Sequence, residues 1–350
     1  MDPVALGHRR AREISRAGAF QEREEGARAM SSPTLPVLDL GPLRAGGDAG
    51  LVVLAAEIRR AAEEVGFFYV ANHGIDPALQ TAAQAAALAF FARPEAEKRR
   101  VAVDRRNRGF MAMGDCRLPG AEASDLKEVF FWGPEAAPDD PEVLAGRPLV
   151  GPNNWPDFQP GLRAAVWPYY RAVLGVGAGL LRAVALSLGL DPEVFASRYR
   201  KPLGRGQLVF YPPHPVGREL PNFGAAPHCD FGCLTLLLQD DNGGLEVETR
   251  DGRWVAAPPL EGTLVVNIGD LLARWSNDRF RSTLHRVVNR SGRRRLSIPV
   301  FYDPDSSAVV DPRDLGLPPG EAPRYEAVAA GDYILSRNKL SFAHYAKAEG

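Results

Sequence analysis

The sequence predicts a mainly β fold with flanking helices, in which an antiparallel sandwich or jelly roll follows a helical N-terminal half. From residue 206 onward, short runs rich in β-branched and aromatic residues are separated by turn sequences such as Asn242-Gly243 and Asp251-Gly252. Such pairs between apolar runs are strong hairpin signals. Upstream, apolar residues recur at the helical period instead. A chain of 350 residues, 45% of them hydrophobic, can bury one large core or two intimate ones.

Composition excludes several classes of function. The 42 basic and 43 acidic residues leave a formal net charge of -1, so no long-range field attracts nucleic acid or an anionic membrane. No apolar run reaches membrane-spanning length, and the N-terminus lacks the apolar core of a signal peptide, so we expect a cytoplasmic protein. The three cysteines, Cys116, Cys229 and Cys233, are too few for a disulfide framework and are predicted to be reduced thiols.

The N-terminal half is predicted to contain two strands and two helices behind a mobile tail. Residues 1–33 are polar and offer little apolar surface to bury, so we expect them to form that tail. Hydrophobic periodicity then predicts a strand over 35–40, a helix over 51–65, a buried strand over 67–70 and a helix over 76–91.

One long helix is expected between the two halves of the chain. Residues 34–160 form an N-terminal region in which 125–132 is apolar enough for a strand or a cavity wall. The strongly apolar segment 161–190 predicts a helix that is kinked or divided at Pro168. We assign 161–200 to scaffold helices that pack on a sheet.

The jelly-roll core is assigned to residues 201–305, and 306–350 form a C-terminal segment that can act as a lid. Within the core, strands are predicted at 207–211, 231–239, 245–248, 263–268, 280–288 and 294–302.

Three residues in this core suggest a metal site. If His228 lies on a strand, the period of two puts His228 and Asp230 on one face, where they can share a metal. His285, on a separate predicted strand, completes a set of two imidazoles and one carboxylate. That set suits non-haem Fe(II) and leaves coordination positions open. A single histidine is more often structural, so the prediction depends on all three residues.

A second group suggests an anchor for a carboxylate. On a strand, Arg295 and Ser297 share a face, so a guanidinium and a hydroxyl can converge on one carboxylate. The plain alternative is a surface charge in a basic run, which we favour for Arg293 and Arg294. Tyr211 either adds a hydroxyl to this group or is a core tyrosine at a strand end.

These groups stand within a longer series of ordered motifs. The motifs are Tyr211-Pro212-Pro213-His214-Pro215, Pro227-His228-Cys229-Asp230, Leu234-Thr235-Leu236-Leu237, Gly244-Leu245-Glu246-Val247, Val266-Asn267-Ile268-Gly269-Asp270, His285-Arg286-Val287 and Arg295-Leu296-Ser297. Together with residues 35–39 and 66–74, the series resembles the 2-oxoglutarate- and Fe(II)-dependent dioxygenase superfamily, in its isopenicillin N synthase-like branch. The resemblance covers most of residues 34–304. It implies a distorted double-stranded β-helix, or jelly roll, with the N-terminal helices packed on it.

The resemblance also implies a mechanism. In it, oxidative decarboxylation of 2-oxoglutarate by O2 to succinate and carbon dioxide drives hydroxylation, desaturation or cyclisation of a substrate. Chlorination is not expected, because the related halogenases lack the carboxylate ligand. The implied Fe(II) ligands are His228, Asp230 and His285, and the implied contacts of the distant 2-oxoglutarate carboxylate are Arg295, Ser297 and Tyr211.

Two alternatives remain open at this point. Isopenicillin N synthase-type Fe(II) oxidases share these residues without using 2-oxoglutarate, and a metal-free jelly-roll binding protein is a more remote reading. Val209 and His214 stand where many plant members carry Asn and Cys, which distances the chain from the plant hormone and flavonoid enzymes.

The substrate is expected to be a small molecule. The protein itself is expected to be a monomer or a homodimer, with neither nucleic acid nor a membrane as a partner. An Ala- and Arg-rich composition suggests bacterial specialised metabolism. A substrate carboxylate would meet Arg108 or Arg337, although an exposed arginine is the commoner case. By resemblance, the residues that face the substrate are Arg108, Phe110, Phe131, Arg337 and Phe342.

Overall fold

Two β-sheets face each other and form the centre of the molecule. The computed structural model describes residues 35–346, apart from 46–47, 118–120, 122, 214–223 and 318. The larger sheet has eight strands in the order β1 (Val37–Asp39), β2 (Phe67–Ala71), β10 (Leu264–Ile268), β7 (Leu234–Gln239), β12 (Arg295–Asp303), β5 (Leu203–Tyr211), β4 (Glu128–Trp132) and β3 (Gly109–Met111). The smaller has four, in the order β6 (Ala225–His228), β11 (His285–Val287), β8 (Leu245–Glu248) and β9 (Trp254–Ala256). All neighbouring strands in both sheets are antiparallel except β1 and β2.

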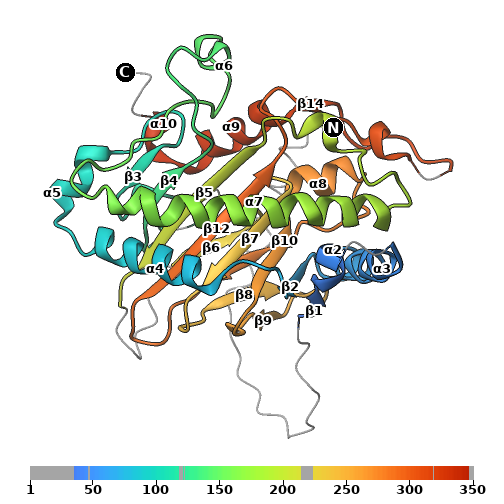
Figure 1. Cartoon of the computed structure of the whole chain (residues 1–350), viewed down its shortest axis with the longest axis horizontal. Coiled ribbons are helices and arrows are strands. Elements are labelled where there is room, and N and C mark those ends of the chain that lie inside the picture. The colour runs from blue at the N-terminus through green and yellow to red at the C-terminus, as the bar shows by residue number, and fades with distance from the viewer. Residues whose placement is uncertain are drawn as a thin grey trace, which may run out of the picture.

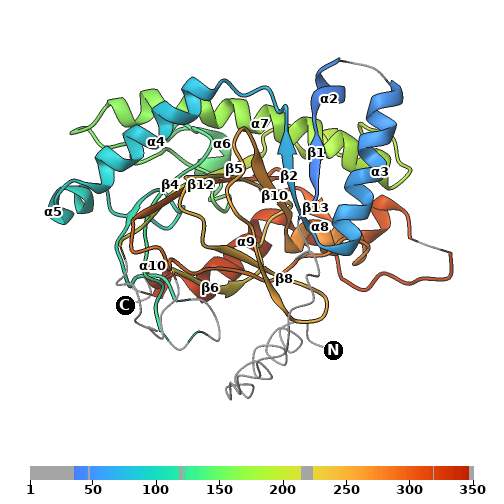
Figure 2. The same ribbon diagram turned by 90° about the horizontal axis from the view of Figure 1, so that it is seen from below.

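Three helices cover the outer face of the larger sheet. They are α3 (Asp48–Glu64), α4 (Pro77–Phe91) and α7 (Gly161–Ser187), and they lie on the side away from the four-stranded sheet (Figures 1 and 2). The remaining short elements are α2 (Gly41–Ala45), α5 (Glu95–Lys98), α6 (Pro141–Leu144), α8 (Asp270–Trp275), β13 (Val309–Val310), β14 (Val328–Ala329), α9 (Ala330–Ser341) and α10 (Ala343–Ala346). This arrangement is the predicted jelly roll with N-terminal helices packed on it.

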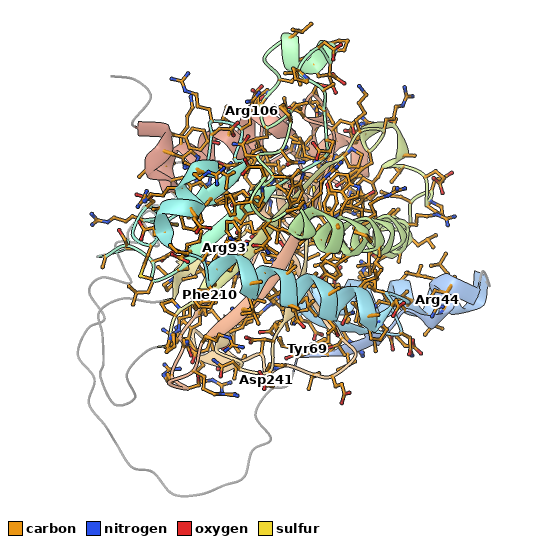
Figure 3. All side chains as sticks on the ribbon, turned by 60° about the vertical axis from the view of Figure 1, so that its left-hand side comes forward. Arg44, Tyr69, Arg93, Arg106, Phe210 and Asp241 are labelled. Atoms are coloured by element: carbon orange, nitrogen blue, oxygen red, sulfur yellow. The ribbon has the colours of Figure 1, made fainter. Side chains whose placement is uncertain are left out.

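Strand alternation divides the side chains of the larger sheet between two cores. On β5, Leu208 faces the helices, whereas Val209 and Tyr211 face the interior between the sheets. Phe210 again turns to the helix side, where its ring stacks on Phe91 of α4 with centroids 5.3 Å apart (Figure 3). The interior face of each strand is therefore the face that can carry a site.

Helix α7 is continuous through Pro168, so the predicted division of this segment is wrong. A proline removes only one backbone donor, whose partner here would be the carbonyl of Ala164. Because Ala164 is exposed, water can satisfy that carbonyl. The helix is long and apolar enough to span a membrane, but half of its most apolar stretch is buried inside the protein. It is a core helix packed on the sheet.

Most predicted strands are present with shifted ends, and a few were missed. The strand predicted over 280–288 is ordered as β11 only at His285–Val287. Strand β6 was missed because it contains Pro227, which lacks a backbone donor, and an edge strand of the smaller sheet tolerates this. The predicted tail over residues 1–33 lies outside the described residues.

The turn between α3 and β2 requires glycine at position 66. Gly66 has φ +75°, and an added Cβ would lie 2.2 Å from the carbonyl oxygen of Arg281. We expect Gly66→Ala to lower the free energy of unfolding by about 3 kcal/mol through strain and steric clash. Gly175→Ala is the matched control, because Gly175 is an exposed α7 residue with open space at its Cβ, and alanine there should stabilise slightly. Equal effects of the two changes on urea unfolding would contradict this account.

Candidate metal centre and its cavity

Two paired strands and the loop after one of them bring the metal-binding side chains together. His228 ends β6, and His285 lies directly opposite it on β11. Asp230 lies beyond the end of β6, so the expectation that His228 and Asp230 share a strand is wrong in that detail. The three still converge, since Asp230 Oδ1 is 3.9 Å from His228 Nε2 and 3.7 Å from His285 Nε2. The predicted metal-binding set is therefore confirmed.

Both imidazoles are held by the backbone of their own segments. Nδ1 of His228 lies 2.7 Å from the carbonyl of Ala226, and Nδ1 of His285 lies 3.1 Å from the carbonyl of Thr283. Since a carbonyl only accepts, each Nδ1 carries the proton and each Nε2 presents its lone pair toward Asp230. Burial, followed by the nearby charge of His285, lowers the pKa of His228 to about 4. The imidazole is thus kept in the neutral form that binds a metal.

Asp230 offers one oxygen to a metal because the other is already engaged. Its Oδ2 accepts hydrogen bonds from Thr235 Oγ1 at 2.5 Å and Asn267 Nδ2 at 2.8 Å, leaving Oδ1 facing the histidines. Burial alone would raise the pKa of this carboxyl, but the two histidines and both hydrogen bonds together hold it below its usual value. Two Nε2 atoms and one carboxylate oxygen, each oriented by neighbouring groups, fit Fe(II) and leave positions open for other ligands.

The hydrogen bonds to Asp230 are expected to tune metal affinity. Thr235→Val keeps the side-chain shape and removes the donor to Oδ2, so Fe(II) affinity should fall about 10- to 100-fold. The control is Thr263→Val, because the Thr263 hydroxyl bonds to the carbonyl of Leu260 and not to a ligand. Fe(II) titration of both variants provides the measurement. Unchanged affinity in Thr235→Val would show that the orientation of the carboxylate does not depend on this contact.

A buried guanidinium without an ion-pair partner lies on the interior face of β12. Arg295 is 1% exposed, and its three nitrogens donate to the carbonyl of Gly243 at 2.6 Å, Ser297 Oγ at 3.1 Å and Gln239 Oε1 at 3.1 Å. Its Cζ lies 4.9 Å from the ring centroid of Tyr211, its register partner on β5. Every one of these hydrogen-bond partners is neutral, and within the described part of the chain the Asp240 carboxylate is near enough to interact with the Arg295 charge but forms no ion pair with it.

A cavity opens beside the metal-binding side chains. Two of the predicted substrate-facing residues, Phe131 of β4 and Phe342 after α9, line it. Arg337 is not among the lining residues, and its guanidinium lies 5.4 Å from the ring centroid of Phe231 and 3.8 Å from the carboxylate of Asp270. The full lining consists of Cys116, Lys127, Val129, Phe131, Arg205, Gln207, His228, Cys229, Asp230, Phe231, Phe301, Asn338 and Phe342.

The prediction that Arg108 and Phe110 face the substrate is wrong. Arg108 is fully buried, and its guanidinium donates to three backbone carbonyls, including that of Leu149 at 2.8 Å. Phe110 belongs to the core under the helices, with its ring 5.9 Å from that of Phe90. The chain enters β3 with the alternation opposite to the one expected, so Met111 and not Phe110 faces the interior.

Sequence reasoning missed the polar side chains of the cavity. Lys127 forms an ion pair with Asp125 at 2.8 Å, and Arg205 forms one with Asp303 at 2.7 Å. The polar Arg205 and Gln207 on the interior face of an otherwise apolar β5 were a signal that could have revealed the lining of this cavity.

Comparisons with known proteins agree with this geometry. A family model described as 2OG-Fe(II) oxygenase superfamily matches residues 193–304, and one described as non-haem dioxygenase in morphine synthesis N-terminal matches residues 35–158. A curated relative is the 2-oxoglutarate-Fe(II) type oxidoreductase hxnY of Emericella nidulans. The two sequences are 35% identical over 322 residues, which cover 89% of this chain and 92% of the relative.

Two solved structures are also similar to the chain. A full-length protein of Neurospora crassa in complex with alpha-KG and thymine has a TM-score of 0.76 and 28% identity, covering 87% of this chain and 96% of that one. JOX2 in complex with 2OG, Fe and JA has a TM-score of 0.74 and 25% identity, covering 96% of both chains.

Proposed function

The chain belongs to the 2OG-Fe(II) oxygenase superfamily, and from this premise we propose that it couples decarboxylation of 2-oxoglutarate to hydroxylation, desaturation or cyclisation of a small molecule. It is a 2-oxoglutarate-dependent Fe(II) oxygenase of small molecules, with iron held by His228, Asp230 and His285. The observation that carries the placement of 2-oxoglutarate is the buried guanidinium of Arg295, whose hydrogen-bond partners are all neutral.

Arg295 is the anchor for the distant carboxylate of 2-oxoglutarate in this proposal. A guanidinium has five N–H donors, and three bond to neutral acceptors, so two remain. A buried charge without an ion-pair partner is unfavourable, which favours an anionic ligand here. The hydroxyls of Ser297 and Tyr211 complete the anchor, and Gln239 orients the guanidinium.

The residues around the iron site determine where the oxidation occurs. When bound, Fe(II) supplies the chemistry by which one O2 oxidises 2-oxoglutarate to succinate and carbon dioxide, with the second oxygen atom available to oxidise the substrate. His228, Asp230 and His285 would hold the metal through two Nε2 atoms and one carboxylate oxygen. The phenylalanine walls of the adjoining cavity would exclude water and orient the substrate.

Both alternative functions are set aside. The match to the superfamily and to a 2-oxoglutarate-Fe(II) oxidoreductase over most of the chain supports the 2-oxoglutarate-dependent class. The convergent metal ligands leave no role for a metal-free binding protein. The assignment to bacterial specialised metabolism stays a prediction, and the curated relative named above is fungal.

The proposed function is tested by its stoichiometry. Protein supplied with Fe(II), O2 and 2-oxoglutarate is screened against small molecules for succinate release. With a true substrate, each succinate should accompany one oxidised product, and both should stop when 2-oxoglutarate is omitted. Product formation that continues without 2-oxoglutarate would contradict the proposal.

The C-terminal segment is proposed to close the cavity. Phe342 pairs with Cys116 in an isolated β-bridge, and its ring lies 5.7 Å from that of Phe131, edge to face. Ending the chain after Lys339 removes this wall, so substrate oxidation should fall at least about tenfold while 2-oxoglutarate still binds. Product formation by the truncated chain is compared with that of the full chain at equal Fe(II) loading. Unchanged product formation would remove the lid from the account.

Three finer expectations concern the charge of the substrate, the location of the protein and its oligomeric state. The expectation of a carboxylate-bearing substrate depended on Arg108 and Arg337, neither of which lines the cavity. We expect a cytoplasmic monomer or homodimer, which is consistent with three free cysteines.

A further inference from the structure

We propose that the primary substrate is a neutral small molecule with a cis-amide edge, such as a lactam or imide, and that Asn338 and Gln207 recognise this edge. A cis-amide edge presents an N–H donor beside a C=O acceptor, and a side-chain carboxamide offers the complementary pair. The inference rests on the proposed function, because it concerns the substrate of the same cavity.

Asn338 carries a buried amide nitrogen without a hydrogen-bond partner. The residue lies on α9, is 1% exposed, and lines the cavity together with the iron ligands His228 and Asp230. Its Nδ2 is buried and makes no hydrogen bond of ordinary geometry, although the amide is close enough to the Tyr345 hydroxyl to oppose the rise in the pKa of that phenol that burial causes. A buried donor left unpaired is destabilising, and such groups in native proteins usually have a partner. A substrate in the cavity would supply one.

Gln207 adds a second amide to the same cavity, half-buried and without a protein partner among the described residues. It lies on the interior face of β5, opposite Phe131 of β4 in the strand register. Its side chain makes no hydrogen bond to any residue in the described part of the chain, and it is half-buried. Two carboxamides on different elements, one from the sheet and one from the C-terminal helix, can therefore bind one polar edge.

The charges in the cavity favour a neutral substrate. The Lys127 ammonium is neutralised by Asp125, and although burial alone would lower the pKa of Lys127, this carboxylate leaves it raised. Arg205 is neutralised by Asp303, to which its Nε and Nη2 both donate. An anionic substrate would have to compete with these buried carboxylates or bury its own charge without a partner.

The remaining walls fit a compact apolar body. Four phenylalanine rings line the cavity, and Phe131 and Phe342 meet edge to face with centroids 5.7 Å apart. The Arg205 guanidinium lies over the Phe301 ring, with Cζ 4.6 Å from the ring centroid, and restricts the ring's movement. Rigid rings of this kind favour a cyclic substrate over a flexible chain.

The experiment uses three ring probes of similar size: 2-piperidone, N-methyl-2-piperidone and cyclohexanecarboxylate. The first has the full amide edge, the second lacks the donor, and the third carries a negative charge. Each is titrated without oxygen into the full-length protein loaded with Fe(II) and 2-oxoglutarate, and perturbation of the charge-transfer band of the chelate is followed. The titrations are repeated with Asn338→Ala and Gln207→Ala.

We expect 2-piperidone to bind at least about tenfold more tightly than either other probe. Each substitution should weaken its binding by about tenfold and reduce its advantage over the N-methyl compound. Tighter binding of the carboxylate, unchanged binding in both variants, or no effect of 2-piperidone on a well-formed band would overturn the inference. Failure of the band itself to form would instead contradict the proposed function on which the inference rests.

Discussion

Replacing His285 by alanine is expected to abolish stoichiometric Fe(II) binding and to reduce turnover by at least about 1,000-fold. His285 supplies one of only three protein ligands found in the described part of the chain, and its Nε2 lies 3.7 Å from Asp230 Oδ1. Each protein ligand contributes several kcal/mol to holding the metal, and every 1.4 kcal/mol is about a factor of ten. Metal content after anaerobic reconstitution and initial rates of succinate release provide the measurements.

The control for this change is His73→Ala. His73 lies in the turn after β2, where its Nδ1 accepts a hydrogen bond from the backbone of Ile75, and it does not line the cavity. The His73→Ala variant should bind iron as the wild-type protein does. Iron bound at full stoichiometry by the His285 variant, with its turnover retained, would contradict the assignment of this histidine.

Replacing Arg295 by alanine is expected to weaken 2-oxoglutarate binding by on the order of 100-fold while iron binding stays intact. The change removes the guanidinium whose free donors meet the distant carboxylate, and removing one partner of a buried charge pair costs about 2–5 kcal/mol. It leaves His228, Asp230 and His285 untouched. Equilibrium titration with 2-oxoglutarate measures the change, and Fe(II) titration checks the metal site separately.

Arg294 provides the matched control, because it is the exposed neighbour of Arg295 on the same chain segment. Arg294→Ala should leave 2-oxoglutarate affinity unchanged. Arg295→Lys should be intermediate, since an ammonium keeps the charge but not the planar fork. Equal loss of affinity at positions 294 and 295 would indicate a general charge effect and would remove the specific anchor.

Alternation within single strands made a large part of the site predictable. Arg295 and Ser297 share a face of β12 as their spacing required, and the hydrogen bond between their side chains shows that they converge. Arg293 and Arg294 precede β12 and are exposed, as the basic run suggested, whereas Arg295, the first residue of the strand, is buried. The position of His285 opposite His228 depends on pairing between distant segments, but the residue types alone indicated a shared metal.

Features that depend on tertiary pairing were not predictable in this way. Asp230 lies in the loop after β6. This loop is stabilised by a hydrogen bond from the backbone N–H of Cys233 to the carboxylate of Asp303, which is 70 positions further along the chain. Asn267 sits in an apolar strand, and only the structure shows that its amide reaches Asp230. The face of β3 on which Phe110 lies depends on how the preceding loop enters the sheet, which periodicity in a strand this short does not determine.

The measurement that tests the central claim most directly is anaerobic titration of the Fe(II)-loaded protein with 2-oxoglutarate. Chelation of ferrous iron by a keto acid gives a weak visible charge-transfer band. We predict a saturable band in the wild type at one 2-oxoglutarate per iron, absent from His285→Ala and requiring far more 2-oxoglutarate in Arg295→Ala. Iron binding without any band would contradict the account, because it would show that 2-oxoglutarate does not reach the metal held by His228, Asp230 and His285.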